Sequence, residues 1–397
     1  MNPIYNEILG ILGDVLFKHE YVLPADVDVD ALFQEALNQS VFPIVYNYVR
    51  GDEKLIVSER WEKRFLQIMR NNFRVLYEHS ELLEVMGKIP FTTFKGAQSA
   101  FYYPDPIIRT MGDVDFIVEE EDRDKVKGII ENAGFQWNND NEHKVHMAFH
   151  RKPNSVWEMH WQIPGIPEGD NGRNVREESK DIIDKARVVE IKGMPCKMAD
   201  EFHHCLVMLT HTAHHMINTG VGLRHICDWS VFANKVDVTQ WKEQLEGCGL
   251  WRFAQILTQV SVRYLYMPQQ EWAMEDVDEA ILKAFIADVF ESGNFGKKDS
   301  GRINQAKLMT DSELGGVDNT PMLVRLYREV NSKAKVAVPA CRNNILLRPF
   351  AWGYVLVRHT MRVKKGERPK LDVKSMVQGA EKRRVLYQEF RLYERKR

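Results

Sequence analysis

The stretch FKGAQSAFYYPDPIIRTMGDVDFIV, residues 94–118, holds two aspartates one residue apart in an apolar run. Side chains of a β-strand alternate between its faces, so Asp113 and Asp115 share one face, with carboxylates roughly 5 to 7 Å apart. Such a pair repels itself unless a cation lies between the two groups. Oxygen ligands favour a hard divalent cation, Mg²⁺ or Mn²⁺, which takes further ligands from water and substrate phosphates. The pattern therefore predicts a metal site that handles phosphate groups.

A third carboxylate on a neighbouring strand would complete this site, and Glu158 is the best candidate. It lies in SVWEMHWQI, residues 155–163, which alternates polar and bulky apolar side chains as a strand does. Glu158 and His160 share one face of that strand. We expect His160 to orient Glu158 or to contact the nucleotide; a satisfied polar residue at a strand end is an equal alternative.

We expect Asp113, Asp115 and Glu158 to be both the metal ligands and the catalytic residues. Two other interpretations stay open. The aspartates could mark a solvent-facing strand end, and Glu158 could form an ion pair with Lys95 or Arg109.

Upstream of the aspartates, Lys95 and Gly96 form a turn from a predicted strand into a short predicted helix. The free N–H groups of a helix N-terminus, a lysine and a glycine that permits close approach together suit a phosphate. Arg109, on the connecting loop, could bind a phosphate oxygen with its planar guanidinium. Gly112 would let the backbone approach the ligand closely. The predicted nucleotide-binding residues are therefore Lys95, Gly96, Arg109, Gly112 and His160.

The pattern along the chain predicts an α+β protein in three parts. Residues 1–88 have helical periodicity, residues 89–198 read as short strands and helices forming a small mixed sheet, and residues 199–397 are helical almost throughout. We expect residues 291–305, which are polar and glycine-bearing, to form an exposed loop. We expect the basic segment 381–397 to be a solvated surface helix.

These motifs carry a resemblance. The lysine-glycine turn, YPDP, RTMGDVD and WEMHW together resemble the nucleotidyltransferase superfamily with a polymerase-beta type palm, and more narrowly a bacterial family of nucleotidyltransferase-like proteins. The likeness covers residues 89–163 and extends loosely to 211–229. It implies a nucleotidyltransferase palm between two helical units, and metal-dependent transfer of a nucleotidyl group from a nucleoside triphosphate through the three carboxylates. The superfamily generally has Gly-Ser where this chain has Lys95-Gly96, so lysine and backbone amides would replace the serine contact.

Histidines offer a competing interpretation. His211, His214 and His215 share a face of a predicted helix and could bind a metal, which would make the protein a histidine-metal phosphohydrolase. No His-Asp dipeptide occurs in the chain, so we expect these histidines to pack the helix against the palm, with His211 or His215 reaching toward the nucleotide. In LRHICDW, Arg224 and Asp228 are four residues apart and could pair along a helix.

Composition limits the partners. The formal net charge is −2, which predicts neither a nucleic-acid coat nor a membrane-surface binder. The start lacks the basic region of a signal peptide, and five scattered cysteines predict neither a disulfide framework nor a thiolate zinc site. We therefore expect a cytoplasmic nucleotidyltransferase that uses Mg²⁺ or Mn²⁺, a nucleoside triphosphate, and a small-molecule, peptide or protein acceptor with a hydroxyl-type group. A catalytically silent nucleotide- or metal-binding regulatory module is the alternative.

Overall fold

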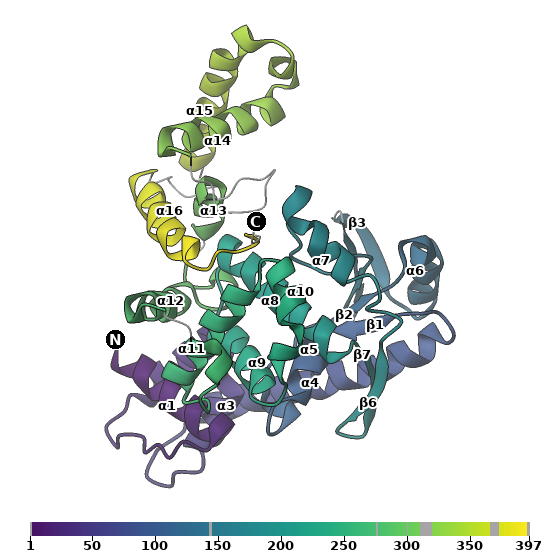
Figure 1. Cartoon of the computed structure of the whole chain (residues 1–397), viewed down its shortest axis with the longest axis vertical. Helices are drawn as coiled ribbons and strands as arrows, with labels where there is room; N and C mark the ends of the chain where they lie inside the picture. The colour runs from purple at the N-terminus through teal and green to yellow at the C-terminus, as the bar shows by residue number, and fades with distance from the viewer. Residues whose placement is uncertain are drawn as a thin grey trace.

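The computed structural model describes residues 2–142, 145–274, 277–299, 301–309, 320–365 and 373–394. Its seven-stranded mixed sheet lies toward one side of the body, away from the N-terminus (Figure 1). The strand order is β3-β4-β5-β2-β1-β7-β6. The β2–β5 and β1–β7 pairs are parallel, and the other neighbours are antiparallel. The strands are Thr92–Phe94 (β1), Val114–Ile117 (β2), Gln136–Glu142 (β3), His146–Arg151 (β4), Ser155–His160 (β5), Arg187–Ile191 (β6) and Met194–Met198 (β7).

Four helices precede the sheet: Pro3–Phe17 (α1), Val29–Asn38 (α2), Phe42–Val49 (α3) and Glu59–Met86 (α4). The long helix α4 contacts β2, β7 and α6, and it buries apolar residues that recur every three or four positions, such as Trp61, Phe65 and Ile68. Gly87 ends α4 with a φ of 56°, a conformation that costs glycine little.

The remaining helices connect the strands or follow them. They are Gly96–Phe101 (α5), Arg123–Asn132 (α6), Arg173–Glu178 (α7), Glu201–Asn218 (α8), Leu223–Ala233 (α9), Lys242–Gly247 (α10), Trp251–Leu265 (α11), Glu279–Ser292 (α12), Arg302–Met309 (α13), Met322–Ala337 (α14), Arg348–Lys364 (α15) and Val373–Gln388 (α16). One contiguous cluster of buried apolar side chains includes residues from α1 to α13, from the sheet and from α16. Among the described residues, no helix combines the length and apolar character that crossing a bilayer requires.

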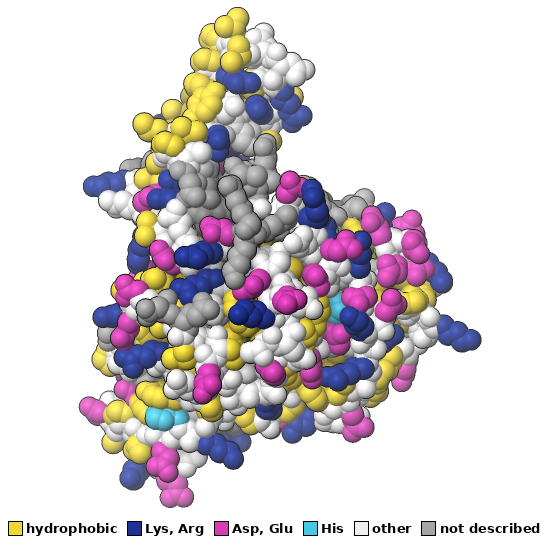
Figure 2. Space-filling model, in the orientation of Figure 1, with side chains coloured by type: hydrophobic (Ala, Val, Ile, Leu, Met, Phe, Trp, Pro, Cys, Tyr) yellow, Lys and Arg dark blue, Asp and Glu magenta, His cyan; other side chains and the backbone are white. Residues whose placement is uncertain are grey.

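The pair α14–α15 stands out from the body of the molecule at one end (Figure 1). It has a small buried cluster of its own, formed by Ala334, Cys341 and Ala351. Figure 2 shows apolar side chains gathered on the surface of this projection, next to lysines and arginines.

The α+β class and the mixed sheet are confirmed, and the division into three parts stays a prediction. Two local expectations are wrong. Ser292, Asn294 and Arg302, within the predicted exposed loop, are buried, and Arg302 begins α13. In the predicted solvated helix, Arg383 and Tyr387 are buried because α16 packs against the body. In both segments tertiary contacts satisfy polar groups that composition alone would assign to solvent.

Candidate active site

Asp115 and Glu158 lie opposite each other on the parallel strands β2 and β5. The Nε2 atom of His160 is 3.1 Å from Oδ1 of Asp115 and 3.6 Å from Oε2 of Glu158. Asp115 and His160 are buried and Glu158 is half-buried, and ligand atoms of all three lie within 4.8 Å of one another. The sheet therefore brings together three of the predicted residues in a group that could hold a metal ion.

A lysine already neutralises part of this group. Lys95 Nζ is 2.8 Å from Asp115 Oδ1, so Asp115 accepts from both Lys95 and His160. Burial by itself would raise the pKa of Asp115, but the charge of Lys95 and the contact with His160 hold that pKa well below its usual range. The alternative interpretation, an ion pair of Glu158 with Lys95, is not what the structure shows, because Lys95 pairs with Asp115.

The backbone of Lys95 is strained. Its φ is 60° and its ψ is −133°, a conformation found almost only at glycine, and it precedes the six-residue helix α5. Gly96 was expected to permit a close approach of phosphate, and an added Cβ there would make only an ordinary contact, 3.6 Å from the carbonyl oxygen of Asp113. An added Cβ at Gly112 would meet nothing within 4 Å, so this glycine leaves open space beside Asp113.

Asp113 lies directly before β2 and lines the same cavity as Asp115 and Glu158. Burial, together with the charges of Asp115 and Glu158, raises the pKa of Asp113 to about 6. Lys95 and Arg224 oppose this rise without cancelling it. Burial and the two neighbouring acids both disfavour the ionised form of Asp113, and a cation bound beside it would favour that form.

Helix α4 holds the loop that leads to Asp113. The buried Asn72 donates through Nδ2 to the carbonyl oxygens of Ile107 (2.7 Å) and Arg109 (2.9 Å), and its Oδ1 accepts from the amide of Met111 (2.9 Å). Asn71 donates to the carbonyl oxygen of Met111 at 2.7 Å. Sequence reasoning missed these two asparagines because only the fold shows that α4 passes this loop.

Arg109 is bound to a carboxylate within the protein. Its Nε and Nη2 donate to the two oxygens of Asp228 at 2.7 and 2.6 Å, and Tyr103 donates to the same carboxylate at 2.8 Å. The suggested pairing of Arg224 with Asp228 is therefore replaced by a bidentate pair between the loop before β2 and helix α9. Arg109 still lines the cavity, and its contact with phosphate stays a prediction.

Arg224 was not predicted as a site residue, yet it lines the cavity with Asp113. Within the described part of the chain it forms no ion pair; it donates to the carbonyl oxygen of Thr110 at 3.3 Å and lies 5.2 Å from the ring centre of Phe295. Burial and neighbouring Arg109 lower the pKa of Arg224, although a guanidinium keeps its charge at physiological pH. The positively charged guanidinium of Arg224 can thus bind an anionic ligand.

Histidines from α8 and α9 line the cavity on the side of these two helices. The rings of His211 and His215 meet edge to face with centres 4.3 Å apart, and His215 lies 4.5 Å from Phe295. Burial, followed by neighbouring positive charges and histidines, lowers the pKa values of His211, His215 and His225 well below the ordinary value. Among the described residues these histidines form no group with metal-ligand spacing, so packing describes them better than metal binding.

The cavity between the sheet and these helices has a volume of about 350 Å³. That volume is typical of small-ligand sites, and the cavity joins the three acids to Lys95 and Arg224. In the metal-free protein, Nε2 of His160 faces the Asp115 carboxylate and so carries the proton. To ligate a metal through Nε2, His160 would have to move that proton to Nδ1.

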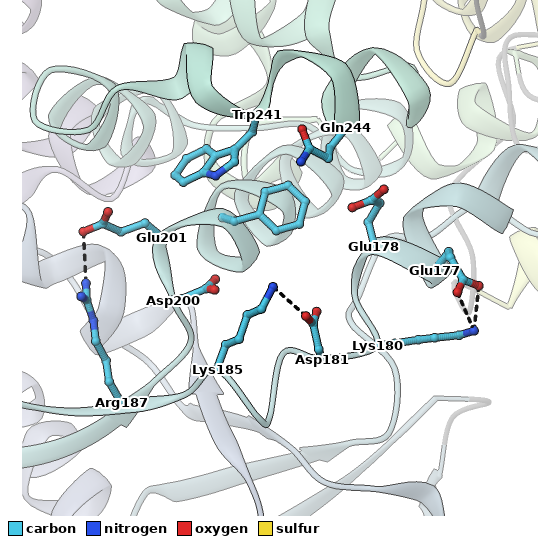
Figure 3. Close-up of a pocket in the computed structure, with 11 residues that line it drawn as sticks. Glu177, Glu178, Lys180, Asp181, Lys185, Arg187, Asp200, Glu201, Trp241 and Gln244 are labelled. Carbon is cyan, nitrogen blue, oxygen red and sulfur yellow. Dashed lines mark hydrogen bonds and ion pairs between the residues drawn. The ribbon is translucent and has the colours of Figure 1, made fainter.

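A larger cavity of about 580 Å³ lies beside the N-terminal end of α8 (Figure 3). Its charged residues are largely paired with one another: Asp181 with Lys185 at 2.6 Å, Glu177 with Lys180 at 2.7 Å, and Glu201 with Arg187 at 3.1 Å. Of the two cavities, only the smaller is lined by acids of the candidate metal group, Asp115 and Glu158, so the chemistry is assigned there.

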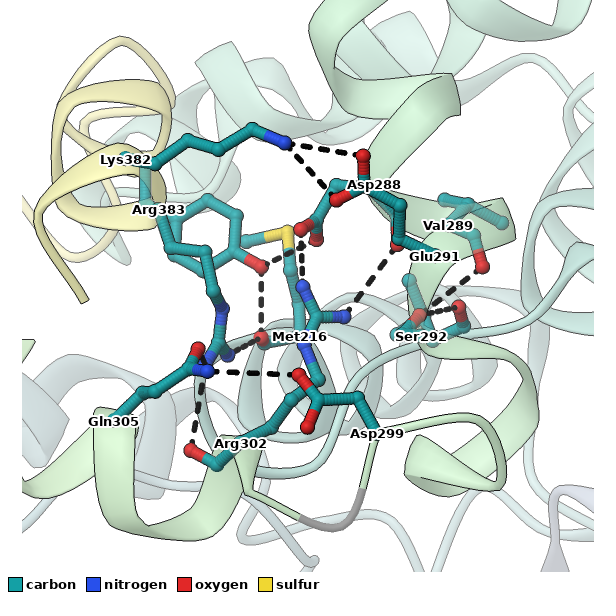
Figure 4. Close-up of polar contacts among 12 residues, drawn as sticks. Met216, Asp288, Val289, Glu291, Ser292, Asp299, Arg302, Gln305, Lys382 and Arg383 are labelled. Carbon is teal, nitrogen blue, oxygen red and sulfur yellow. Dashed lines mark hydrogen bonds and ion pairs between the residues drawn. The ribbon is translucent and has the colours of Figure 1, made fainter. Parts of the chain in front are cut away.

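The other end of α8 is held by the C-terminal part of the chain (Figure 4). Arg383 of α16 donates through Nη2 to the carbonyl oxygens of Met216 (2.9 Å) and Ile217 (2.8 Å). Tyr387 bridges Met216 and Asp288, and Asp288 forms a buried ion pair with Arg302. Helices α12, α13 and α16 therefore fix the helix that carries His211 and His215.

Comparison with known proteins agrees with the site. A family model described as "Uncharacterised nucleotidyltransferase" matches residues 25–265, which is more than half of the chain. The match includes β2, β5, α8 and α9, and it ends with α11. No curated protein and no solved structure matches the chain.

Proposed function

The chain belongs to the family of uncharacterised nucleotidyltransferases, and from that premise we propose that it transfers a nucleoside monophosphate from a nucleoside triphosphate to a hydroxyl-type acceptor with the help of a divalent cation. The observation that carries the proposal is the pairing of Asp115 with Glu158 on parallel strands, with His160 in contact with both carboxylates. Asp115 and Glu158 line a cavity that three cationic side chains, Lys95, Arg109 and Arg224, also line.

Asp113, Asp115 and Glu158 would hold Mg²⁺ or Mn²⁺, with His160 as a further ligand. The donor set is rich in oxygen, as such ions prefer. The pKa of Asp113 is raised by burial and then by the charges of Asp115 and Glu158, and a bound cation would favour the ionised carboxylate. When bound, the cation would supply charge stabilisation for the reacting phosphate.

The cationic side chains would hold the triphosphate. Arg224 has unpaired donors facing the cavity, and Lys95 becomes available once a cation replaces it beside Asp115. Arg109 would act mainly by fixing the loop before Asp113, since Asp228 engages two of its nitrogens. Gly96 and Gly112 leave room for phosphate at the same wall.

In the reaction, an acceptor oxygen forms a bond to the α-phosphorus while the bond to the bridging oxygen of pyrophosphate breaks. Pyrophosphate leaves with that electron pair, and the acceptor proton passes to a carboxylate that faces the cavity. The acceptor would enter beside the uncharged histidines of α8 and α9.

The test is incubation of the protein with nucleoside triphosphates labelled at the α-phosphate, Mg²⁺ or Mn²⁺, and a small-molecule cell extract as the source of acceptor. We expect labelled product, pyrophosphate release, and loss of at least about 100-fold in rate for Asp113→Asn or Asp115→Asn. The matched control is Asp26→Asn, at an exposed aspartate. Equal rates for parent and Asp113→Asn would refute the mechanism.

The ion pair between Lys95 and Asp115 favours a second candidate, a nucleotide-binding module without transfer activity. If the lysine never leaves, a triphosphate could bind through Arg224 while no cation enters. Calorimetry with a nonhydrolysable triphosphate, with and without Mg²⁺, separates the two: affinity that is unchanged by Mg²⁺, together with no product, identifies the module.

A further inference from the structure

Charge is unevenly distributed along the chain. Residues 321–365, which contain α14 and α15, have ten lysines and arginines and only one acidic residue, Glu329. This segment therefore has a formal charge of +9 in a chain whose net charge is −2. Glu329 is half-buried and pairs with Lys333 at 2.8 Å, so the projection offers almost no negative charge to a partner.

The same projection exposes many large apolar side chains. On α15, Phe350, Tyr354, Val357 and Met361 follow a four-three-four spacing that puts them on one helix face, and they are 78%, 50%, 56% and 60% exposed. Other large apolar residues of the projection are also exposed: Leu323, Val324, Tyr327, Val330, Val336, Ile345, Leu346, Leu347 and Leu356. Apolar surface of this extent on a soluble protein marks a surface that another body covers.

The positive charge of the projection indicates what kind of partner covers this apolar surface. Two copies of this face would repel each other because both carry strong positive charge and neither offers acids to pair. A protein partner would have to match apolar side chains spread over two helices and the turn between them. An anionic bilayer needs no matching shape, because apolar side chains enter among the acyl chains while lysines and arginines meet the headgroups.

We propose that the α14–α15 projection docks the protein on an anionic lipid bilayer. The helices lie in the interface, with the Phe350–Met361 face toward the acyl chains and residues such as Arg358 and Lys364 at the headgroups. The projection lies beyond residue 265, outside the family match, so docking is separate from the chemistry of the sheet. The proposed function can fail without affecting this proposal.

The test is vesicle flotation of the full chain, using vesicles of phosphatidylcholine alone or of phosphatidylcholine with phosphatidylglycerol. We expect binding to the anionic vesicles only, and weaker binding as salt rises. Arg358→Gln with Lys364→Gln should weaken binding about 25-fold, since each charge contributes about fivefold. Phe350→Ser with Met361→Ser should weaken it at least about tenfold.

Matched controls come from an exposed loop far along the chain from the projection: Lys54→Gln and Ile56→Ser, the latter at a residue that is 92% exposed. Neither should change binding. Circular dichroism would verify that each variant is folded.

Three outcomes would overturn the proposal: no binding to anionic vesicles, equal binding to neutral vesicles, or equal losses in the control variants. A dimer in light scattering that Phe350→Ser dissociates, with no vesicle binding, would also overturn it and assign the face to a second copy of the chain.

Discussion

Replacing Asp113 with asparagine should make the metal-free protein more stable. The carboxylate is held near Asp115 and Glu158, and its pKa is raised from 3.8 to about 6. One pKa unit corresponds to 1.36 kcal/mol, so the ionised group costs the folded state about 3 kcal/mol above its pKa. Asparagine has nearly the same shape and cannot ionise, so it avoids this cost.

The sign of the pH dependence follows from proton binding. Between about pH 4 and about pH 6, the folded wild-type protein keeps a proton on Asp113 that the unfolded chain has lost. The free energy of unfolding therefore falls as pH rises through this window because of Asp113, and that contribution is constant above it. The advantage of Asp113→Asn should grow from near zero at about pH 4 to about 3 kcal/mol at about pH 8.

The assay is urea unfolding followed by tryptophan fluorescence, in chelator, at several pH values. Differences between variant and parent cancel the other titrating groups. Asp26→Asn, at an exposed aspartate, is the control and should change stability by less than about 0.5 kcal/mol. A destabilised Asp113→Asn protein at about pH 8, or a difference that does not change with pH, would contradict the reasoning about the acid group.

Three further predictions follow from the same contacts. Lys95→Met should lose about 3 kcal/mol of stability because Asp115 loses its buried cationic partner. Lys95→Gly should recover about 1 kcal/mol of that loss because glycine relieves the strained backbone. Equal urea midpoints for the two variants would contradict the backbone strain. Asn72→Ala should cost about 2 to 4 kcal/mol, since it removes three buried hydrogen bonds to the loop before Asp113, and thermal unfolding measures it. Binding of Mn²⁺, measured by electron paramagnetic resonance, should weaken below about pH 6 as Asp113 takes up a proton and should be lost in Asp115→Asn; binding that is indifferent to both would argue against a metal here.

The strands of the site could be predicted from sequence because the signals are local. The spacing of Asp113 and Asp115 and the alternation around Glu158 each need only a few residues of context. Their register against each other is long-range, and the parallel pairing of β2 with β5 emerges only in the folded sheet.

The arginines show where local reasoning fails. The four-residue spacing of Arg224 and Asp228 suggested a helical pair, but Asp228 turns to Arg109, 119 residues away in the chain. Helix spacing shows which residues are neighbours on one helix and says nothing of a better partner on another element. Arg224, left without that partner, became a cavity residue that no motif indicated.

Net charge describes the chain only as a whole. The formal charge of −2 predicted neither a nucleic-acid coat nor a membrane-surface binder, and it is an average over a strongly positive projection and a negative remainder. The signal was present in residues 321–365 and required only a local count.

The anchoring of α8 by Arg383 changes what the C-terminal third contributes. The last carbonyl groups of any helix lack hydrogen-bond donors within that helix. Here an arginine more than 160 residues later in the chain donates hydrogen bonds to two of them. A chain shortened to the family match would leave these two carbonyl oxygens without their donor, and we expect the C-terminal end of α8 to fray. Residues outside the family match thus hold the end of α8 in place. Activity lost on truncation would indicate that this helix is less ordered, and would not by itself indicate that a catalytic group is missing.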